Sequence, residues 1–550
     1  MTSLLPDRLT GRLAGRLAGR STRRSAAAGH GSRRVVIIGG GIAGLATAAL
    51  LASRGHSVDL LEKNDELGGR VGSIEQDGFR FDTGASWYLM PEVFEHFFSL
   101  LGTSADAELE LSVLDPSYRV FFEGHPEPLD IRPDRAHNRA LFESVEPGAG
   151  DRFDAYLSSA EETYDIALRR FLYSNFDSSS SFLRSDVVRR TPKLSRLLTR
   201  SLGSHVAAQF SDNRLRQVLG YPAVFLGSSP SRAPSMYHLM SRLDLGDKVL
   251  YPQGGFTQLI AVIAALAERH GARLHTGSAV TQILVKDPAR GGRAHVTGVE
   301  HATGGGGRRT ISADVVVGAA DLHHLETTLL PPALQTHPPQ AWRRRSPGPG
   351  AVLAMLGVEG RLPQLAHHSL FFTSDWDRNF GDIFGREARV PDPASIYVCK
   401  PSESDPTVAP EGCENLFVLV PVPADVAIGR GGDDGRGSEA VERATDAAID
   451  QVAAWAGAPD LRDRIRVRHT VGPEDFERRY NAWRGGALGL EHNLRQSAFL
   501  RPRNVSSKVD GLLYAGASTV PGVGLPMCLI SAELVLKRMT GDRSSLPVAE

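Results

Sequence analysis

The chain has 550 residues, of which 41% are hydrophobic and 23% are charged, and its formal net charge is −1. A chain of this length exceeds what one hydrophobic core usually supports, so two domains are expected, and the balanced charge excludes a general attraction to nucleic acid. The three cysteines, Cys399, Cys413 and Cys528, include no C-x-x-C pair, which favours neither a zinc site nor a disulfide framework and fits a reducing, cytoplasmic setting.

The first 33 residues are rich in arginine and are expected to form a disordered tail. Arg23 and Arg24 are similar to a twin-arginine export signal, but no apolar stretch follows them, so no signal peptide is predicted. The sequence contains no run of about 18 apolar residues, which argues against a transmembrane helix. Contact with a membrane is therefore expected to be peripheral.

A dinucleotide-binding unit is predicted at the start of the globular part. Residues 35–38 form an apolar run typical of a buried strand, and it leads directly into Gly39-Gly40-Gly41-Ile42-Ala43-Gly44. Apolar residues at helical spacing then predict a helix up to Arg54, ended by Gly55, and a second strand over residues 57–61. Strand, G-x-G-x-x-G, helix and strand in this order form the fingerprint of nucleotide binding.

Each glycine of this unit has a physical role. Gly39 permits the tight turn, Gly41 lets the backbone approach a pyrophosphate, and Gly44 allows helix and strand to pack closely. The phosphates are expected at the helix N-terminus. Glu62, about 20 residues after the turn, is expected to accept hydrogen bonds from the adenosine ribose. The unit alone does not separate NAD from FAD.

Further motifs follow along the chain. Leu67-Gly68-Gly69-Arg70 offers bare backbone and one guanidinium that can close on a diphosphate from a second side. Phe81-Asp82-Thr83-Gly84-Ala85-Ser86 comes next, and Val280 begins a predicted strand near the middle of the chain. Residues 513–526 read LYAGASTVPGVGLP, a strand and glycine turn before a helix predicted from Met527 through Leu536, whose N-terminus again favours an electron-rich group.

In this order the motifs resemble those of the bacterial and fungal type of phytoene desaturase, within the wider flavoprotein group that includes the amine oxidases. The resemblance runs from about Arg34 to about Met539. It implies an α/β fold, with a Rossmann-like FAD-binding domain of the amine-oxidase and phytoene-desaturase type and an interleaved α+β substrate domain. The resulting expectation assigns residues 34–95, 250–322 and 495–540 to the FAD-binding domain, 96–249 and 323–494 to a substrate and membrane-facing domain, and 1–33 and 541–550 to tails.

The resemblance also implies non-covalently bound FAD and the residues that contact it. Two stretches near the expected flavin ring depart from the usual pattern of the family, Ala85-Ser86-Trp87 and Ser518-Thr519-Val520-Pro521, and they leave the particular polyene and the number of new double bonds open. The positions that match the family's FAD-contact motifs are Gly39, Gly41, Ala43, Gly44, Glu62, Gly69, Arg70, Val280, Gly516, Gly524, Leu525 and Pro526.

The function implied is that of an FAD-dependent oxidoreductase acting on CH–CH groups in carotenoid biosynthesis. It would convert a C40 precursor, phytoene to lycopene through phytofluene, zeta-carotene and neurosporene, and pass electrons to oxygen or a quinone. Because flavin carries the redox step, an apolar slot is expected, without a metal site and without an assigned catalytic acid or base. Asp82 is interpreted as a turn cap and His238 as a packed histidine.

Three alternatives stay open at this stage. The first is a desaturase of another carotenoid intermediate, and the second is a flavin amine or porphyrinogen oxidase. The third, from a different class, is a flavin-free prenyl-binding escort protein, against which the phosphate glycines, Glu62 and Arg70 argue.

A membrane-facing surface is predicted between Arg169 and Arg200, because apolar residues alternate there with arginines. Thr191 and Pro192 predict the start of a helix with leucines on one face. Such a stretch is typical of interfacial binding, which would place the protein in the cytoplasm on the membrane surface, but equally of a helix packed on its own core. The apolar residues concerned are Phe171, Leu172, Phe182, Leu183, Val187, Val188, Leu194, Leu197, Leu198 and Leu202, and the basic ones are Arg169, Arg170, Arg184, Arg189, Arg190, Lys193, Arg196 and Arg200. Two glycine-rich segments, Gly304–Gly307 and Gly429–Gly437, are predicted to be exposed loops.

Overall fold

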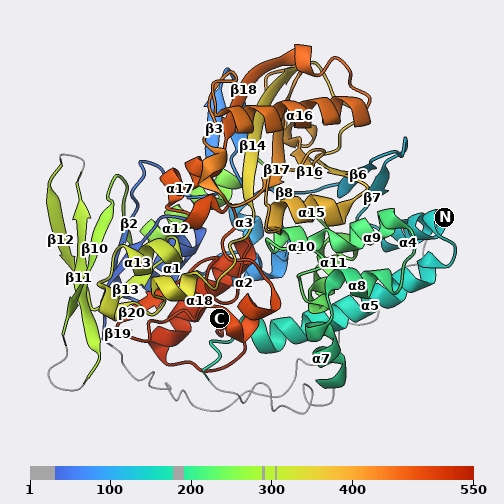
Figure 1. Ribbon diagram of the computed structural model, residues 1–550. Coiled ribbons are helices and arrows are strands. Elements are labelled where there is room, and N and C mark those ends of the chain that lie inside the picture. Colours follow the sequence, from blue (N-terminus) through green and yellow to red (C-terminus); the bar gives the residue numbers. More distant parts are fainter. Residues whose placement is uncertain (1–30, 178–190, 288–291, 304–305) are drawn as a thin grey trace, which may run out of the picture. The chain divides into compact units, whose positions relative to one another are not determined.

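The computed structural model describes residues 31–177, 191–287, 292–303 and 306–550 (Figure 1). Residues 33–550 form one compact unit. Residues 1–30 of the predicted disordered tail lie outside the described residues, whereas Arg33 belongs to the compact unit. The predicted membrane residues that also lie outside them are Phe182, Leu183, Arg184, Val187, Val188, Arg189 and Arg190.

A parallel sheet of five strands forms the centre of the nucleotide-binding part. Its strands come from three separate parts of the sequence, and their order is β20-β13-β1-β2-β9. The middle strand, β1, pairs in parallel with β13 and β2, so that Ile38 lies beside Gly318 on one side and Leu61 on the other. The five strands are β1 (Arg34–Ile38), β2 (Ser57–Leu61), β9 (Arg273–His275), β13 (Val315–Gly318) and β20 (Leu512–Tyr514).

Three helices pack together against this sheet: α1 (Ile42–Ser53), α12 (Phe256–Arg269) and α18 (Leu525–Thr540). Helix α1 contacts both of the others, and its small residues allow nearly its whole surface to be buried. A Cβ atom at Gly44 would lie 2.0 Å from the carbonyl oxygen of Gly39, so only glycine fits there. The predicted strand–helix–strand unit is therefore confirmed, including its end at Gly55, which has a φ of +83°.

A second sheet has seven strands in the order β18-β14-β17-β16-β15-β6-β7. All neighbouring strands in it are antiparallel except β15 and β6. Helix α16 (Glu439–Trp455) covers one face, where its apolar side packs on β14 and β17 (Figure 1). The strands are β6 (Tyr118–Phe122), β7 (Leu129–Ile131), β14 (Gly350–Glu359), β15 (His368–Phe372), β16 (Ile396–Cys399), β17 (Cys413–Val422) and β18 (Ile465–Val471).

The helices of residues 135–245 form a region with its own apolar core, which includes Phe153, Tyr156 and Leu215. Helix α5 (Ala149–Ala167) is the longest of them and continues into a π-helical turn over Leu168–Leu172. The others are α4 (Arg135–Val145), α7 (Thr191–Thr199), α8 (Leu202–Ala207), α9 (Asn213–Gly220), α10 (Pro222–Phe225), α11 (Ser241–Leu245) and the 3-10 helix Ser235–Met240.

The remaining elements are smaller. Strands β10 (Val280–Lys286), β11 (Ala294–Ala302) and β12 (Arg308–Ser312) form a sheet beside the central one, joined by β19 (Val509–Asp510) (Figure 1). The other elements are β3 (Ser73–Gln76), β4 (Phe79–Asp82), β5 (Leu111–Val113), β8 (Leu250–Pro252), α2 (Pro91–Ser99), α3 (Ala105–Glu108), α13 (Leu322–Thr327), α14 (Pro339–Trp342), α15 (Trp376–Phe384) and α17 (Pro473–Tyr480). The strands of the central sheet fall inside the three segments assigned to FAD binding, while the full two-domain division stays a prediction.

The predicted membrane helix is shorter than expected. Helix α7 ends at Thr199, and Leu202 instead begins α8 and is fully buried, so its assignment to the same helical face is wrong. The break occurs because the Ser201 hydroxyl caps α8 by accepting the N–H of Ser204. On α7 itself Leu197 is buried and Arg196 is exposed, so part of the leucine stripe packs on the protein's own core. Among the described residues, none of the helices combines the length and apolarity needed to span a bilayer.

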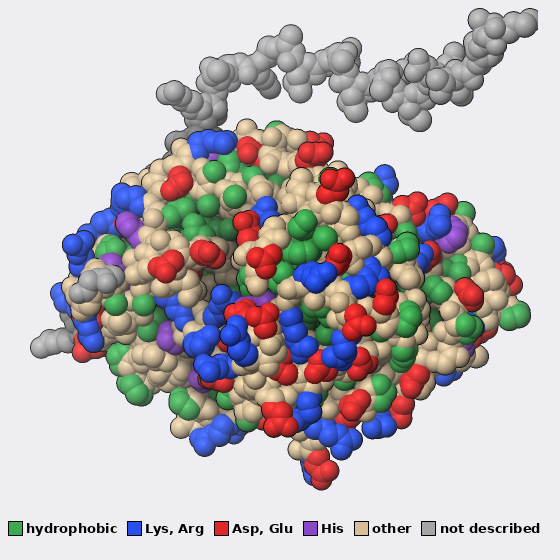
Figure 2. Space-filling view, turned by 90° about the horizontal axis from the view of Figure 1, so that it is seen from above, with side chains coloured by type: hydrophobic (Ala, Val, Ile, Leu, Met, Phe, Trp, Pro, Cys, Tyr) green, Lys and Arg blue, Asp and Glu red, His purple; other side chains and the backbone are tan. Residues whose placement is uncertain are grey.

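The two glycine-rich segments differ from each other. Gly306 and Gly307 are exposed, as predicted, and Gly304 lies outside the described residues. Gly429 is buried, and a Cβ atom at Gly431 would lie 1.8 Å from the carbonyl oxygen of Thr470. The prediction of an exposed loop is therefore wrong for the start of this segment, because it packs against β18. Over the face of the molecule in Figure 2, side chains of both charge signs are interspersed, in keeping with the net charge of −1.

Candidate active site

One large cavity, of about 690 Å³, joins the nucleotide-binding part to the second sheet and the helical region. Its volume lies within the range of ligand pockets. All of the residues predicted to contact the cofactor line this cavity except Gly44, which packs against Gly39 instead. The structure therefore brings together four motifs that are up to almost 500 residues apart in the sequence: Gly39, Gly41 and Ala43; Glu62, Gly69 and Arg70; Val280; and Gly516, Gly524, Leu525 and Pro526.

The carboxylate of Glu62 is buried at the end of β2 and is held in place by three donors. Its Oε2 accepts the backbone N–H of Gly40 at 2.7 Å, and its Oε1 accepts the backbone and side-chain N–H groups of Asn64 at 2.9 and 2.8 Å. A carboxylate has about four acceptor positions. Glu62 can thus accept a further hydrogen bond, such as one from a ribose hydroxyl.

Arg70 lines the cavity with an incompletely satisfied guanidinium. Its terminal nitrogen donates to the carbonyl of Gly486 at 3.3 Å, and its central carbon lies 5.8 Å from the centre of the Tyr480 ring. Its Nε is buried and finds no hydrogen-bond partner among the described residues. A buried cationic donor of this kind fits an anionic ligand such as a diphosphate.

Two helix N-termini border the cavity. Helix α1 begins after Gly41 and helix α18 after Gly524, and both N-termini place partial positive charge beside the cavity. A Cβ atom at Gly41 would approach nothing closer than the Gly68 oxygen at 3.8 Å, and one at Gly516 nothing closer than the Ala43 side chain at 3.7 Å. Protein therefore leaves space at these two glycines that a ligand can fill. These features together fit the diphosphate of FAD.

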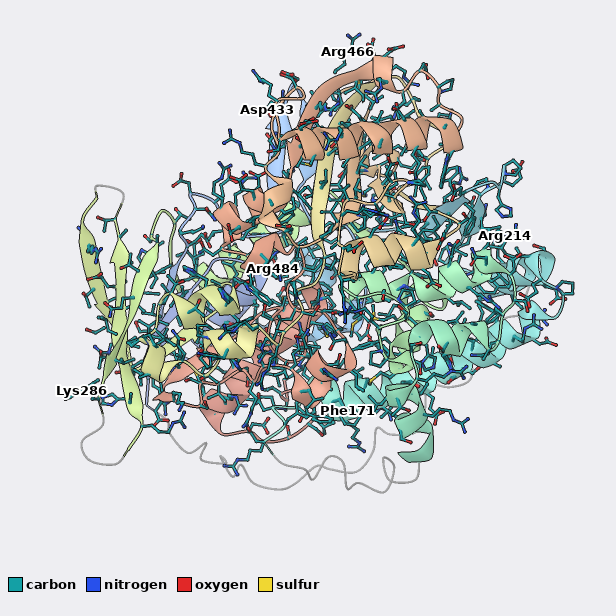
Figure 3. The ribbon with its side chains drawn as sticks, in the orientation of Figure 1. Phe171, Arg214, Lys286, Asp433, Arg466 and Arg484 are labelled. Atoms are coloured by element: carbon teal, nitrogen blue, oxygen red, sulfur yellow. The ribbon has the colours of Figure 1, made fainter. Side chains whose placement is uncertain are left out.

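The rest of the cavity is mostly apolar. Its lining includes residues of β14 and β17 and of the π-helical turn after α5, where Phe171 lies (Figure 3). Such a surface suits a long ligand without hydrogen-bonding groups. The main apolar lining residues are Trp87, Leu89, Met90, Phe171, Leu172, Phe176, Phe225, Leu239, Met240, Leu353, Phe417, Leu419 and Leu488.

Arg501 holds the loops around the C-terminal glycine motif, a role that the sequence did not reveal. The side chain is fully buried and donates to the carbonyl oxygens of Thr519, Gln496 and Leu490 at 3.0 to 3.1 Å. Burial lowers the pKa of Arg501 to about 10, so it still carries its charge at neutral pH. The hydrogen bonds to these carbonyl oxygens are therefore strengthened by the positive charge of Arg501.

His492 fixes the same motif from another side. Its Nε2 accepts the backbone N–H of Val523 at 3.2 Å, and its Nδ1 lies 2.8 Å from the hydroxyl of Tyr237. Because Nε2 accepts, the proton is on Nδ1, which donates to the Tyr237 oxygen. Burial holds the pKa of His492 well below its usual range, so the ring is neutral. A Cβ atom at Gly522 would lie 2.3 Å from the ring, which requires glycine there.

A second, small pocket of about 10 Å³ lies beside the large cavity and shares Gly84, Ala85 and Ser86 with it. Asp82 lines it, and its Oδ2 accepts the N–H of Phe256, the first residue of α12, at 2.8 Å. Asp82 therefore supports the start of a helix that is distant in sequence, and its interpretation as the cap of a local turn is wrong. His238 is buried away from the large cavity, 2.9 Å from the carbonyl of Ser235 and 3.0 Å from the hydroxyl of Ser159, as a packed histidine would be.

Comparison with known proteins identifies relatives over almost the whole chain. The family model for flavin containing amine oxidoreductase matches residues 42–537. The Haloarcula japonica protein named carotenoid 3,4-desaturase is 40% identical, with 92% of this chain and 98% of the relative covered. The zeta-carotene-forming phytoene desaturase of Myxococcus xanthus is 35% identical (92% and 94% covered), and the phytoene desaturase of Fusarium fujikuroi is 31% identical (93% and 90% covered).

Solved structures agree in fold. Cyclohexylamine oxidase from Brevibacterium oxydans matches with a TM-score of 0.55 and 16% identity, covering 93% of this chain and 99% of that one. Putrescine oxidase bound to putrescine matches with a TM-score of 0.57 and 16% identity, covering 93% and 98%. At such low identity the likeness concerns the fold alone.

Proposed function

This chain belongs to the family of flavin-containing amine oxidoreductases, and we propose that it acts within that family as an FAD-dependent desaturase of a carotenoid. The predicted fold class, the resemblance to carotenoid desaturases and the flavin cofactor are confirmed by the family match and by relatives that are 31 to 40% identical. Relatives with these names favour desaturation over the amine or porphyrinogen oxidase alternative. A flavin-free escort protein would not need the glycines and Arg70, which fit a diphosphate.

The FAD-contact residues are part of this proposal. Gly39, Gly41 and the N-terminus of α1 would hold the diphosphate, with Gly69 and Arg70 closing on it from the opposite side. Glu62 would accept the ribose hydroxyl, and the α18 N-terminus at Gly524 would face the flavin ring. Bound in this way, FAD supplies the acceptor for the hydride that leaves the substrate.

The single observation that carries the proposal is the continuity of the cavity. The glycine and arginine cradle for a diphosphate opens into a chamber lined mainly by large apolar side chains, without a partition between them. The protein therefore places a polyene against the cofactor and keeps water away from both. Hydrogen bonds of Arg501 and His492 hold the loop before α18, and this loop sets the position of the helix whose N-terminus would face the flavin.

The proposal includes two candidate substrates. Phytoene, converted to lycopene, stays the first candidate, in line with the relatives from Myxococcus xanthus and Fusarium fujikuroi. The relative with 40% identity is named for the 3,4 bond, and this favours a later carotenoid as the second candidate. Oxygen or a quinone would take up the electrons.

The test is incubation of FAD-reconstituted protein in liposomes that contain either phytoene or lycopene, followed by separation of the products and their absorption spectra. Red polyenes formed from phytoene support the first candidate. A longer-wavelength product from lycopene alone supports the second. If both substrates return unchanged while FAD is bound, both candidate substrates are refuted, and other carotenoid intermediates and then peroxide release with amines become the next measurements.

A further inference from the structure

Three chemically reactive side chains meet behind the wall of the large cavity. His368 begins β15, His367 directly precedes it, and Cys399 ends β16, opposite His368 in the antiparallel ladder. All three are buried, with 2% or less of their surface exposed. One possible ligand atom from each lies within 4.8 Å of those from the other two. Strand pairing thus assembles a cluster that has no motif in the sequence.

Hydrogen bonds fix the orientation of both imidazole rings. Nδ1 of His368 lies 2.8 Å from the hydroxyl of Tyr397, which itself donates to Ser86 Oγ at 2.8 Å. The hydroxyl has one proton, so at His368 it accepts, and Nδ1 carries the ring proton. Nδ1 of His367 lies 3.1 Å from the hydroxyl of Ser404 and has the same kind of partner. A metal-binding histidine usually donates its other ring N–H to an oxygen acceptor, and the two hydroxyl oxygens can accept in this way.

The other nitrogen of each ring, Nε2, lacks a hydrogen-bond partner among the described residues. Within the described part of the chain, neither Nε2 of His367 nor Nε2 of His368 has a hydrogen-bond partner, although both atoms are buried. Proteins pair nearly all buried polar atoms, so two neighbouring orphans need an explanation. Nitrogen lone pairs beside a buried sulfur form a soft to borderline donor set, which a transition-metal cation satisfies.

Space for a fourth ligand is present. The small pocket of about 10 Å³ is bordered by Cys399 and Asp82. This volume is close to that of one water probe. Oδ1 of Asp82 is buried and has no partner among the described residues, so it can accept a hydrogen bond from a water molecule there. One bound ion with its water would account for three orphaned atoms at once.

We propose that Nε2 of His367, Nε2 of His368 and Sγ of Cys399 bind one Zn²⁺ ion, with a water molecule in the small pocket as fourth ligand. Two histidines, one cysteine and a water form a tetrahedral set that zinc accepts. The cysteine binds as thiolate, and its proton leaves to solvent. The proposed site differs from the sequence-based expectation of no metal and does not depend on the proposed desaturation.

The ion would stiffen one wall of the large cavity. The Trp87 ring, which lines the cavity, stacks on the His368 ring with centres 4.1 Å apart and planes 10° apart. Tyr397 lines the cavity as well and is hydrogen bonded to the same histidine. A zinc-bound His368 would therefore hold both side chains in fixed positions. The role of the ion is structural, and no redox step is assigned to it.

The test is elemental analysis of the purified holoprotein after passage over a chelating resin, compared with three variants. About one zinc per chain is expected for the native protein. The zinc content per chain of Cys399→Ser and of His368→Gln should be at least about tenfold lower than that of native protein. Cys413→Ser, in the neighbouring strand β17, should have the same zinc content as native protein. Far-UV circular dichroism and flavin absorption show whether each variant is folded.

A titration keeps the proposal testable if a ligand variant does not fold. Native protein stripped with a chelator is titrated with ZnCl₂, and one equivalent should bind with release of protons. Tyr397→Phe, which keeps the ring but loses the support of His368, should bind zinc about tenfold more weakly. The proposal is overturned if native protein neither contains zinc nor takes it up, or if Cys399→Ser binds zinc as well as native protein does.

Discussion

The hydroxyl of Tyr237 lies 2.8 Å from Nδ1 of His492, and through this contact the helical region supports the loop that leads into α18. The other nitrogen of the same ring accepts the N–H of Val523, one residue before the glycine that caps α18. Removal of the hydroxyl leaves a buried donor on His492 without an acceptor.

Tyr237→Phe should therefore lower the free energy of unfolding by about 1 to 3 kcal/mol and lower the Tm of the holoprotein. The measurement is thermal unfolding followed by circular dichroism and by release of flavin fluorescence. Tyr88→Phe is the control, because the Tyr88 hydroxyl is buried without a partner among the described residues and its loss should not lower the Tm. Equal losses in both variants would contradict the role given to His492.

Arg70→Ala should weaken FAD binding by about 10- to 100-fold, because a charge-assisted hydrogen bond to the diphosphate is lost. Quenching of flavin fluorescence on titration into the flavin-free protein gives the Kd. The matched control is Arg478→Ala on α17, whose side chain is 63% exposed and pairs with Asp475. An unchanged Kd for the Arg70 variant would remove that residue from the cofactor site.

Gly41→Ala and Gly44→Ala should fail in different ways. An added methyl at Gly41 meets no protein atom closer than 3.8 Å, so the flavin-free protein should keep its Tm while FAD binding falls, since the methyl takes space assigned to the diphosphate. At Gly44 the methyl would lie 2.0 Å from the Gly39 oxygen, so the fold itself should be destabilised. Thermal unfolding without FAD separates the two, and a Tm loss at Gly41 as large as that at Gly44 would contradict the space seen beside α1.

Asp244→Asn should change how stability depends on pH. Burial raises the pKa of Asp244 to about 7, although the hydrogen bond from Tyr118 acts to lower it. In the unfolded chain the pKa has its ordinary value near 3.8. Between these values the native state binds more protons than the unfolded state, so stability falls as pH rises. The variant cannot ionise and should gain up to about 4 kcal/mol over the native protein at pH near 8, and little at pH near 4.

The difference in Tm between the two proteins, measured from low to high pH, isolates this carboxyl group because all other groups titrate in both. A constant difference across the range would mean that Asp244 has an ordinary pKa.

Peripheral membrane binding through the surface between Arg169 and Arg200 is the last prediction. Arg196 is exposed on α7, and Arg169, whose side chain is 70% exposed, lies two residues before the cavity-lining Phe171. Changing both to glutamate should reduce co-sedimentation with anionic liposomes, since each cation near such a surface contributes about 1 kcal/mol. Arg443→Glu on α16 is the control, and undiminished binding of the double variant would point to another surface.

Local features of the site could be predicted from sequence, and long-range ones could not. The glycine turn before α1 and the acidic end of β2 belong to one βαβ unit, where spacing along the chain determines position in space. Arg501 and His492 gave no such signal, because their partners are set by the packing of separate loops. The helical spacing of the leucines gave a wrong prediction at Leu202, because Ser201 caps a new helix that begins there. This local capping interrupts the helical periodicity of the leucines.

The central sheet has a consequence for the order in which the protein can become functional. Its edge strand β20 and the helix that follows it lie within the last 40 or so residues, yet they complete the phosphate- and flavin-facing cavity begun by β1. During synthesis on the ribosome, the first nine-tenths of the chain emerges without this closing piece. Flavin capture therefore has to wait until α18 has been synthesised, and a chain that stops short of α18 would leave the ribosome without a closed cofactor site.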